Sequence, residues 1–179
     1  MIPKGQAVHM ITNNESEYLS AVRSVASGTL LATEDTYTQH GNTSCLLHSL
    51  AVAYYSCKLA EKLGAHRFSI RELIRGALLH DYFLYDWHVK PFHEENGLHG
   101  FSHPLTAWQN ATRDYTLTKR EQDIIRKHMF PLTLTKIPRY RESWIVTTVD
   151  KWLSLYEVFG RKTYRVDEIQ EAYKIIMNI

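Results

Sequence analysis

The residues of this chain that could carry chemistry are histidines and aspartates in or at the ends of apolar helical segments. They recur roughly one helix and one connection apart, as His48, His80, Asp81, His103, His128 and Asp150. In a helical bundle, facing helices each supply one or two metal ligands. Imidazole and carboxylate groups together suit borderline transition metals such as Fe, Mn, Co, Ni or Zn, whereas Ca²⁺ prefers oxygen ligands throughout. The pattern therefore predicts a metal centre.

Six ligands are more than one ion ordinarily needs if it keeps an open coordination position. We therefore predict two divalent transition-metal ions, with Fe or Mn favoured and Co, Ni, Zn or Mg as alternatives. Asp81, which directly follows His80, is predicted to be the bridging carboxylate and the catalytic residue. The competing interpretation is that each histidine is an ordinary hydrogen-bonded core residue. The coincidence of six such residues favours the metal, because two of them are acids that are costly to bury unpaired.

Helical periodicity and capping signals predict the elements that must position these side chains. Helices are expected at 15–27, 44–63, 70–81, 104–114, 119–130, 138–159 and 165–178. Ser69–Glu72 and Thr118–Glu121 have the pattern of capping boxes. Residues 33–43 are expected to be a polar turn and residues 82–100 a long loop, and no strand-like alternation is found. The predicted fold class is all-α, a compact helical bundle with about six to eight helices.

A chain of 179 residues can bury the core of one domain without disulfides. We predict a single domain over residues 1–179. Within it, 1–38 would be an N-terminal helix and loop, 40–160 the metal-binding core, and 161–179 a C-terminal helix. The helix at 44–63 is apolar on two sides, which predicts a central position and puts His48 on a buried stripe.

Composition argues against several classes of function. The net charge is only +2, and no dense stripe of Lys and Arg suggests contact with nucleic acid. No apolar run approaches the roughly 20 residues of a membrane span, and the N-terminus lacks a signal-peptide core. Cys45 and Cys57 have no zinc or CxxC spacing and are expected to be small buried residues in a reducing compartment. The protein is predicted to be cytoplasmic, with no nucleic-acid or membrane partner; its oligomeric state is not indicated.

Three segments are similar to the motifs of a known family. They are His48-Ser-Leu-Ala-Val-Ala, Gly76-Ala-Leu-Leu-His80-Asp81 and Thr148-Val-Asp150. Together they resemble the HD-domain superfamily of metal-dependent phosphohydrolases, over about residues 40–160. The resemblance implies an HD-type helical fold, with a metal-binding quartet formed by His48, His80, Asp81 and Asp150.

Two further segments are similar to the binuclear branch of that family, which includes cyclic-di-nucleotide phosphodiesterases and dinucleoside-polyphosphate hydrolases. They are Phe101-Ser-His103-Pro104 and Ile124-Ile-Arg-Lys-His128. The implied reaction is hydrolysis of a phosphate ester or anhydride by a metal-activated water, on a small-molecule substrate, in particular a nucleotide. The chain departs from the cyclic-dinucleotide members at Tyr82–Asp86, where many of them have Gly-Lys, and it lacks their later Gly-Tyr-Pro. This departure speaks against a cyclic dinucleotide as the substrate.

Four residues outside the ligand set are candidates for substrate binding: His40, Asp86, His99 and Lys151. For the first three, the competing interpretation is a solvated loop residue or a helix cap. Lys151 directly follows a ligand on a helix, where neighbouring side chains point in different directions. Its alternative is therefore an ordinary surface or salt-bridging lysine. Tyr85 and Trp87, on the same loop as Asp86, could also line a substrate pocket.

Two other functions are compatible with the same ligand set. HD-type scaffolds with four histidines and two aspartates also include mixed-valent di-iron oxygenases that act on inositol or phosphonates. The third possibility is a metal-containing, nucleotide-binding regulatory module without catalytic activity. The complete ligand set argues against that third function, because a lapsed site is expected to have lost a ligand.

Overall fold

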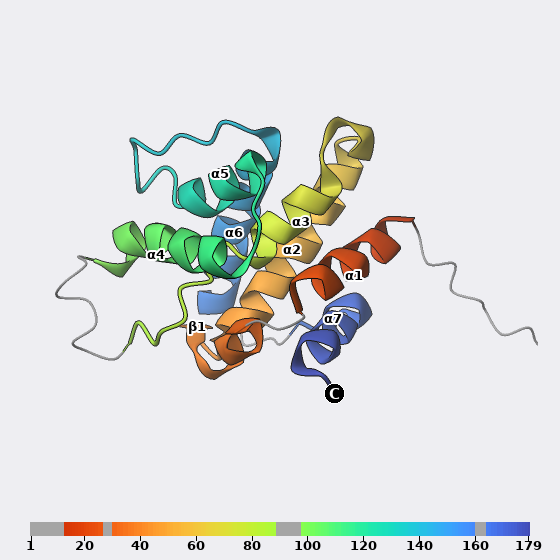
Figure 1. Cartoon of the computed structure of the whole chain (residues 1–179), viewed down its shortest axis with the longest axis horizontal. Coiled ribbons are helices and arrows are strands. Elements are labelled where there is room, and N and C mark those ends of the chain that lie inside the picture. The colour runs from red at the N-terminus through yellow and green to blue at the C-terminus, as the bar shows by residue number, and fades with distance from the viewer. Residues whose placement is uncertain (1–12, 27–29, 89–97, 160–163) are drawn as a thin grey trace, which may run out of the picture.

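The computed structural model describes residues 13–26, 30–88, 98–159 and 164–179 (Figure 1). These ranges contain seven α-helices, two 3₁₀ helices and one two-stranded sheet. The helices are α1 (Asn13–Ala26), α2 (Cys45–Lys62), α3 (Ile70–Leu78), α4 (His99–Asp114), α5 (Lys119–Lys127), α6 (Arg141–Phe159) and α7 (Asp167–Met177). The short elements are η1 (Leu30–Thr36), η2 (Ala65–Arg67), β1 (Thr38–His40) and β2 (Thr43–Ser44). The all-α prediction is confirmed.

Helix α2 has the central position that its two apolar sides predict. It packs against α3, α6 and α7, while α3 contacts α1 and α5, and α5 also contacts α4 and α6. Figure 1 shows α1 and α7 on one side of the α2–α3 pair and α4 and α5 on the other. The side chain of Ser44 caps α2 by accepting a hydrogen bond from the backbone N–H of Leu47. The contacts between these helices bring α4, α5 and α6 around one end of α3.

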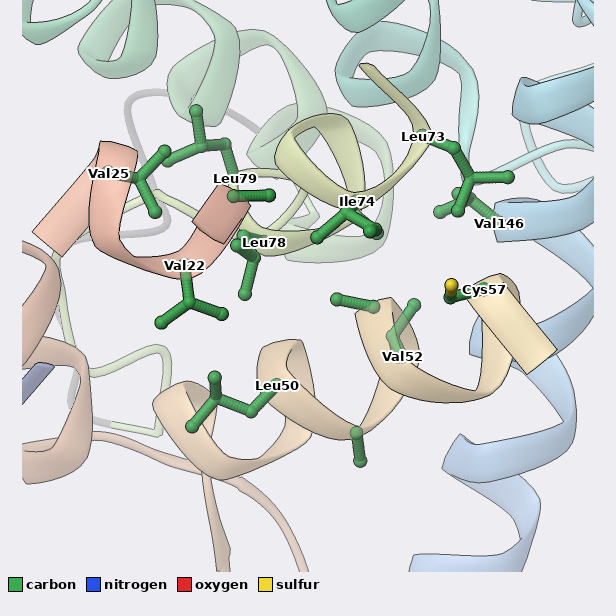
Figure 2. Packing of buried hydrophobic residues seen from close by; sticks show 14 of the residues in the cluster. Val22, Val25, Leu50, Val52, Cys57, Leu73, Ile74, Leu78, Leu79 and Val146 are labelled. Carbon is green, nitrogen blue, oxygen red and sulfur yellow. The ribbon is translucent and has the colours of Figure 1, made fainter. Parts of the chain in front are cut away.

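The apolar core lies between α1, α2, α3 and α6 (Figure 2). Leu50 and Val52 of α2 face Ile74 and Leu78 of α3, and all four side chains are fully buried. Each large aliphatic side chain buried in this way contributes roughly 1.5–3 kcal/mol relative to exposure. The core therefore fixes α3 firmly against α2, and with it the turn that follows α3.

The ends of several helices differ from the sequence predictions. Helix α3 ends at Leu78, so His80 and Asp81 lie in the turn after it and not within the helix. The capping box predicted at Ser69 is wrong, since its side chain makes no capping bond and its backbone N–H donates to Glu142 of α6. The capping box at Thr118 is confirmed, with both reciprocal hydrogen bonds present. A long-range partner displaced the local one at Ser69, which a local pattern cannot reveal.

Pro104 and Pro138 do not stand at the first turn of a helix as their sequence context predicts. Helix α4 begins at His99, so Pro104 lies in its second turn and not its first. Helix α6 begins at Arg141, after Pro138 rather than at it. Proline is favoured in the first turn of a helix, because in the interior it removes one backbone hydrogen bond. Packing of the rest of the helix can outweigh the loss of that bond. The earlier start of α4 moves His103 inside the helix.

The segment expected to be a polar turn contains a small hairpin. Strands β1 and β2 pair antiparallel, with Thr38 opposite Ser44 and His40 opposite Thr43. Gly41 in the connection has a φ of +58°, a conformation that glycine adopts readily. Strands of three and two residues are too short for a visible alternation, so the expectation of no strand was wrong here.

No helix in the described ranges is long and apolar enough to cross a membrane. The first twelve residues of the predicted N-terminal unit lie outside the described residues. The same is true of 89–97 in the predicted long loop and of 160–163 before the C-terminal helix.

Gly76 allows α3 and α5 to approach closely, and this contact supports a prediction. A Cβ at position 76 would lie 2.6 Å from Cδ1 and 3.1 Å from Cβ of Ile124. We expect Gly76→Ala to lower the free energy of unfolding by about 1 kcal/mol net, because overpacking costs about 1–3 kcal/mol and the gain in helix propensity returns up to about 1 kcal/mol. Urea denaturation measures the change. Adding Ile124→Val should restore part of the loss, and an additive double variant would contradict this account.

Candidate metal centre

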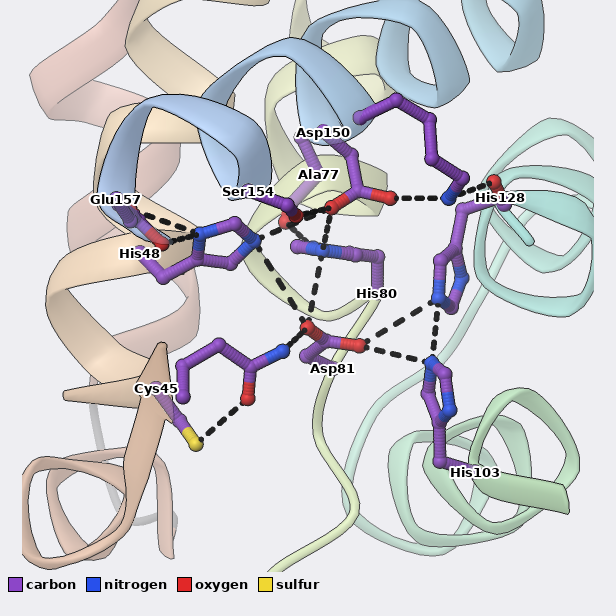
Figure 3. A network of polar contacts seen from close by, with 12 residues as sticks. Cys45, His48, Ala77, His80, Asp81, His103, His128, Asp150, Ser154 and Glu157 are labelled. Carbon is purple, nitrogen blue, oxygen red and sulfur yellow. Dashed lines mark hydrogen bonds and ion pairs between the residues drawn. The ribbon is translucent and has the colours of Figure 1, made fainter. Parts of the chain in front are cut away.

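The six predicted ligands come together at one end of α3 (Figure 3). Helix α2 supplies His48, the turn after α3 supplies His80 and Asp81, and the other three come from α4, the C-terminal cap of α5 and α6. All six side chains are buried, with at most 4% of any residue exposed. Two overlapping groups have ligand atoms close enough to hold a metal ion, namely His48–His80–Asp150 and His80–Asp81–His128.

The first half of the site is formed by His48, His80 and Asp150. Oδ1 of Asp150 lies 3.3 Å from Nε2 of His48 and 3.8 Å from Nε2 of His80. The second half is formed by His103 and His128, whose Nε2 atoms are 2.8 Å apart. The two halves meet at Asp81.

Asp81 has one carboxylate oxygen directed to each half. Its Oδ2 lies 3.3 Å from Nε2 of His80 and 3.9 Å from Nε2 of His48. Its Oδ1 lies 3.3 Å from Nε2 of His103 and 3.5 Å from Nε2 of His128. A carboxylate placed in this way can bridge two ions, one on each oxygen.

The other ring nitrogen of each histidine is held by an acceptor. Nδ1 of His80, His103 and His128 donates to the backbone carbonyls of Ala77, His99 and Ile125 at 2.7, 2.8 and 2.9 Å, respectively. Nδ1 of His48 lies 2.9 Å from the carboxylate of Glu157. A carbonyl oxygen only accepts, so in each neutral ring the hydrogen is on Nδ1 and the lone pair is on Nε2. All four lone pairs then face the interior of the site, as in metal-binding histidines.

Several polar atoms of this cluster have no satisfactory protein partner. Nε2 of His80 and Oδ1 of Asp81 are buried without a hydrogen bond. The facing Nε2 atoms of His103 and His128 would repel each other unless a proton or a cation lay between them. Leaving buried polar atoms unpaired is costly. The donor set, its orientation and these unpaired atoms fit a bound transition metal.

The electrostatics of the site favour cations. Burial opposes ionisation of Asp81, but His80 and His103 hold the pKa of its carboxyl well below the usual range. Burial also opposes the charged form of His48, which by itself would lower its pKa. Hydrogen bonds to Asp150 and Glu157 outweigh this effect and raise the pKa of His48 to about 9. His48 therefore takes up a proton readily in the absence of metal, whereas burial and the neighbouring His80 hold the pKa of His128 well below its usual value. Metal ligands must be deprotonated, so metal ions and protons compete for these rings.

Three residues that support the ligands lie outside the predicted set, and one of them, Ser154, donates to Oδ1 of Asp150 at 3.3 Å. Glu157 is buried, contacts His48 as described and accepts a hydrogen bond of 2.6 Å from Tyr164. It lies two turns after Asp150 on α6, so its spacing alone indicates that it shares a helix face with that ligand. Gln39 donates to Oδ2 of Asp81 at 2.5 Å. No local pattern marked Gln39, because it reaches the site only through the hairpin.

Replacing Glu157 with glutamine is expected to lower metal affinity about 10–100-fold, as is typical when a group that orients a ligand is changed. An amide is a weaker acceptor than a carboxylate, so His48 would be held less firmly and be a less basic ligand. Competition with a metal-sensitive dye measures the affinity. Glu61→Gln, in an α2 residue that pairs with Lys58, is the matched control and should leave affinity unchanged. If Glu157→Gln and the wild type bind metal with equal affinity, Glu157 does not support the metal ligands.

A cavity of about 330 Å³ opens beside the ligands, and three of the four candidate substrate residues line it: His40, His99 and Lys151. For Lys151, the sequence offers substrate binding or an ordinary salt-bridging lysine, and the structure shows both a place at the cavity and an ion pair with Asp150. Its long side chain folds back, and Nζ donates to Oδ2 of Asp150 at 2.8 Å and to the carbonyl of His128 at 3.0 Å.

Asp86 is not among the residues that line this cavity. Its carboxylate accepts hydrogen bonds from the backbone and ring of His88, and its side chain is 41% exposed. Trp87 does line the cavity, and its ring stacks on that of His99 with centroids 4.9 Å apart. Residues 82–88, the described part of the loop after Asp81, therefore supply an aromatic ring to the cavity and no carboxylate.

Comparison with known proteins identifies no similar protein. A scan against protein-family models found no match, and searches of curated proteins and of solved structures found none that is significant. The chemistry of the site therefore has to be inferred from its own geometry.

Proposed function

We propose that the protein is a metal-dependent phosphohydrolase of the HD-domain type, which hydrolyses a phosphate ester or anhydride of a small molecule such as a nucleotide. The observation that carries this proposal is the position of Asp81, with opposite carboxylate oxygens facing two histidine groups. Two ions such as Fe or Mn, held by these six residues, would supply Lewis acidity and a water of lowered pKa.

The residues around the cavity have roles that suit phosphate chemistry. The ammonium group of Lys151 lies at the edge of the site, where it can attract a phosphoryl group into the cavity. Gln39 holds the orientation of Asp81 through its hydrogen bond. The stacked rings of Trp87 and His99 offer an aromatic wall for a planar group such as a nucleobase.

The volume of the cavity indicates the size of substrate that it can hold. About 330 Å³ lies at the lower end of the range for small-molecule sites. A single nucleotide or a smaller phosphate ester fits a volume of this size. This agrees with the departure of the sequence from the cyclic-dinucleotide members at Tyr82–Asp86.

A substrate panel tests the proposal. Purified protein loaded with Mn²⁺, Fe²⁺, Co²⁺ or Ni²⁺, and shown by elemental analysis to contain the metal, is assayed for phosphate release from nucleotides, sugar phosphates and dinucleoside polyphosphates. Turnover that is lost with a chelator and restored by metal supports the proposal. No phosphate release by any metal-loaded form would contradict it. Oxygen uptake with a mixed-valent iron signal would assign the site to the oxygenase class instead, and tight nucleotide binding without turnover would indicate a regulatory module.

A further inference from the structure

Helix α6 exposes a long apolar face on the side away from the core. Its exposed large apolar side chains are Trp144 (43%), Trp152 (57%), Leu155 (60%), Tyr156 (39%), Val158 (58%) and Phe159 (84%). At 100° per residue, these positions and Thr148 share one side of the helix. They extend over roughly 22 Å, taking 1.5 Å per residue. Helices on a protein surface ordinarily carry charged residues on this side.

This face carries almost no charge. Between Trp144 and Phe159, the acids Asp150 and Glu157 are buried on the opposite side of the helix. The remaining charge, Lys151, is bonded to Asp150 and directed into the metal cavity. The exposed side of α6 between Trp144 and Phe159 is therefore apolar, with the paired Lys151 as its one charged residue.

Several of these aromatic rings are already held in place. Trp152 stacks on Tyr156 with centroids 6.2 Å apart and meets Tyr55 of α2 edge-on at 5.9 Å. Trp144 meets Phe130 edge-on at 5.3 Å. Side chains that are ordered beforehand lose less conformational entropy when another surface covers them.

We propose that this face of α6 is the interface of a homodimer, in which the same face of a second copy of the chain covers it. The four aromatic residues expose roughly 500 Å², taking about 150–250 Å² for a whole side chain. Leu155 and Val158 bring the area closer to the ~800 Å² that each partner contributes to a standard interface. The composition, rich in Trp, Tyr and Phe and depleted in charge, is that of an interface core.

A second copy fits this face better than other occupants do. In a two-fold interface the same surface meets itself, and a face without charge meets its copy without repulsion. An acidic partner or an anionic lipid surface would be recognised by lysines and arginines around the apolar residues. In the described part of the chain, Lys151 is the only basic residue of α6 between Trp144 and Phe159, and it is bonded to Asp150. Lys58 and Lys62 of α2 lie beside Trp152, and Lys58 pairs with Glu61, so no large basic cluster surrounds this face in the described residues.

The mass of the protein in solution tests the proposal. Size-exclusion chromatography with light scattering, over micromolar to tens of micromolar protein, should give twice the 20.9 kDa mass of the chain. Trp152→Glu and Leu155→Glu should each shift the protein to monomer and raise the dissociation constant at least about 100-fold, as expected when a charge enters an interface core. Circular dichroism and thermal melting show whether each variant is folded.

Leu134→Glu is the matched control, because Leu134 is 71% exposed but lies outside α6, in the connection before it. It should leave the dimer intact. Leu155 is aliphatic and takes no part in the ring contacts of Trp152, so Leu155→Glu decides the matter if Trp152→Glu does not fold. A wild-type protein that stays monomeric, or α6 variants that stay dimeric, would overturn the proposal. Dissociation by Leu134→Glu to the same extent would also overturn it, since the effect would then not be specific to this face.

Discussion

Replacing Asp81 with alanine is expected to abolish turnover and to lower the metal content of the purified protein. Asp81 has one carboxylate oxygen near the histidines of each half of the site, so its loss weakens both metal positions. We expect turnover to fall on the order of 10³-fold or more, because metal-ion stabilisation of a transition state is worth several kcal/mol. Elemental analysis and phosphate-release assays measure the two effects.

Asp86→Ala is the matched control for this experiment. Asp86 lies five residues later in the same loop, but its carboxylate is exposed and does not line the cavity. The control should keep its full metal content and nearly all of its activity. Wild-type metal content in Asp81→Ala, from protein shown to be folded, would mean that Asp81 is not a ligand.

Removing either His103 or His128 is expected to change the metal stoichiometry from two ions to one. These two rings face Oδ1 of Asp81, whereas His48 and His80 lie near its Oδ2 and also near Oδ1 of Asp150. His103→Ala and His128→Ala should therefore lose one ion each and keep the ion held by the remaining ligands. Elemental analysis after removal of loosely bound metal gives the ratio. The double variant should lose no more metal than either single one, because both rings serve the same position.

His66→Ala controls for the loss of a histidine as such, since His66 is exposed in η2 and lies outside the six-residue cluster. It should retain the wild-type stoichiometry. If both cavity variants also bind two ions per chain, the two-metal assignment is wrong. A wild-type protein with a single ion, kept in both variants, would place that ion with His48, His80 and Asp150.

The sequence was sufficient for the fold class and the central helix. Apolar residues on two sides of α2 indicated a buried position, and the capping box at Thr118 indicated where α5 begins. These features depend on neighbours within four residues in the chain, so local patterns contain them. The same reasoning failed at Ser69, where Glu142 from a distant helix takes the hydrogen bond that the local pattern assigned to Glu72.

The sequence by itself determined which residue types could bind a metal, because buried histidines and acids on apolar stripes require partners. It did not determine how they divide into two halves around Asp81. That division depends on where four helices and the turn after α3 converge. The tertiary structure also brought Gln39 and Glu157 into contact with the ligands, left Asp86 outside the cavity and turned Lys151 toward it. Such contacts join residues up to about a hundred positions apart, and only packing of the whole chain decides them.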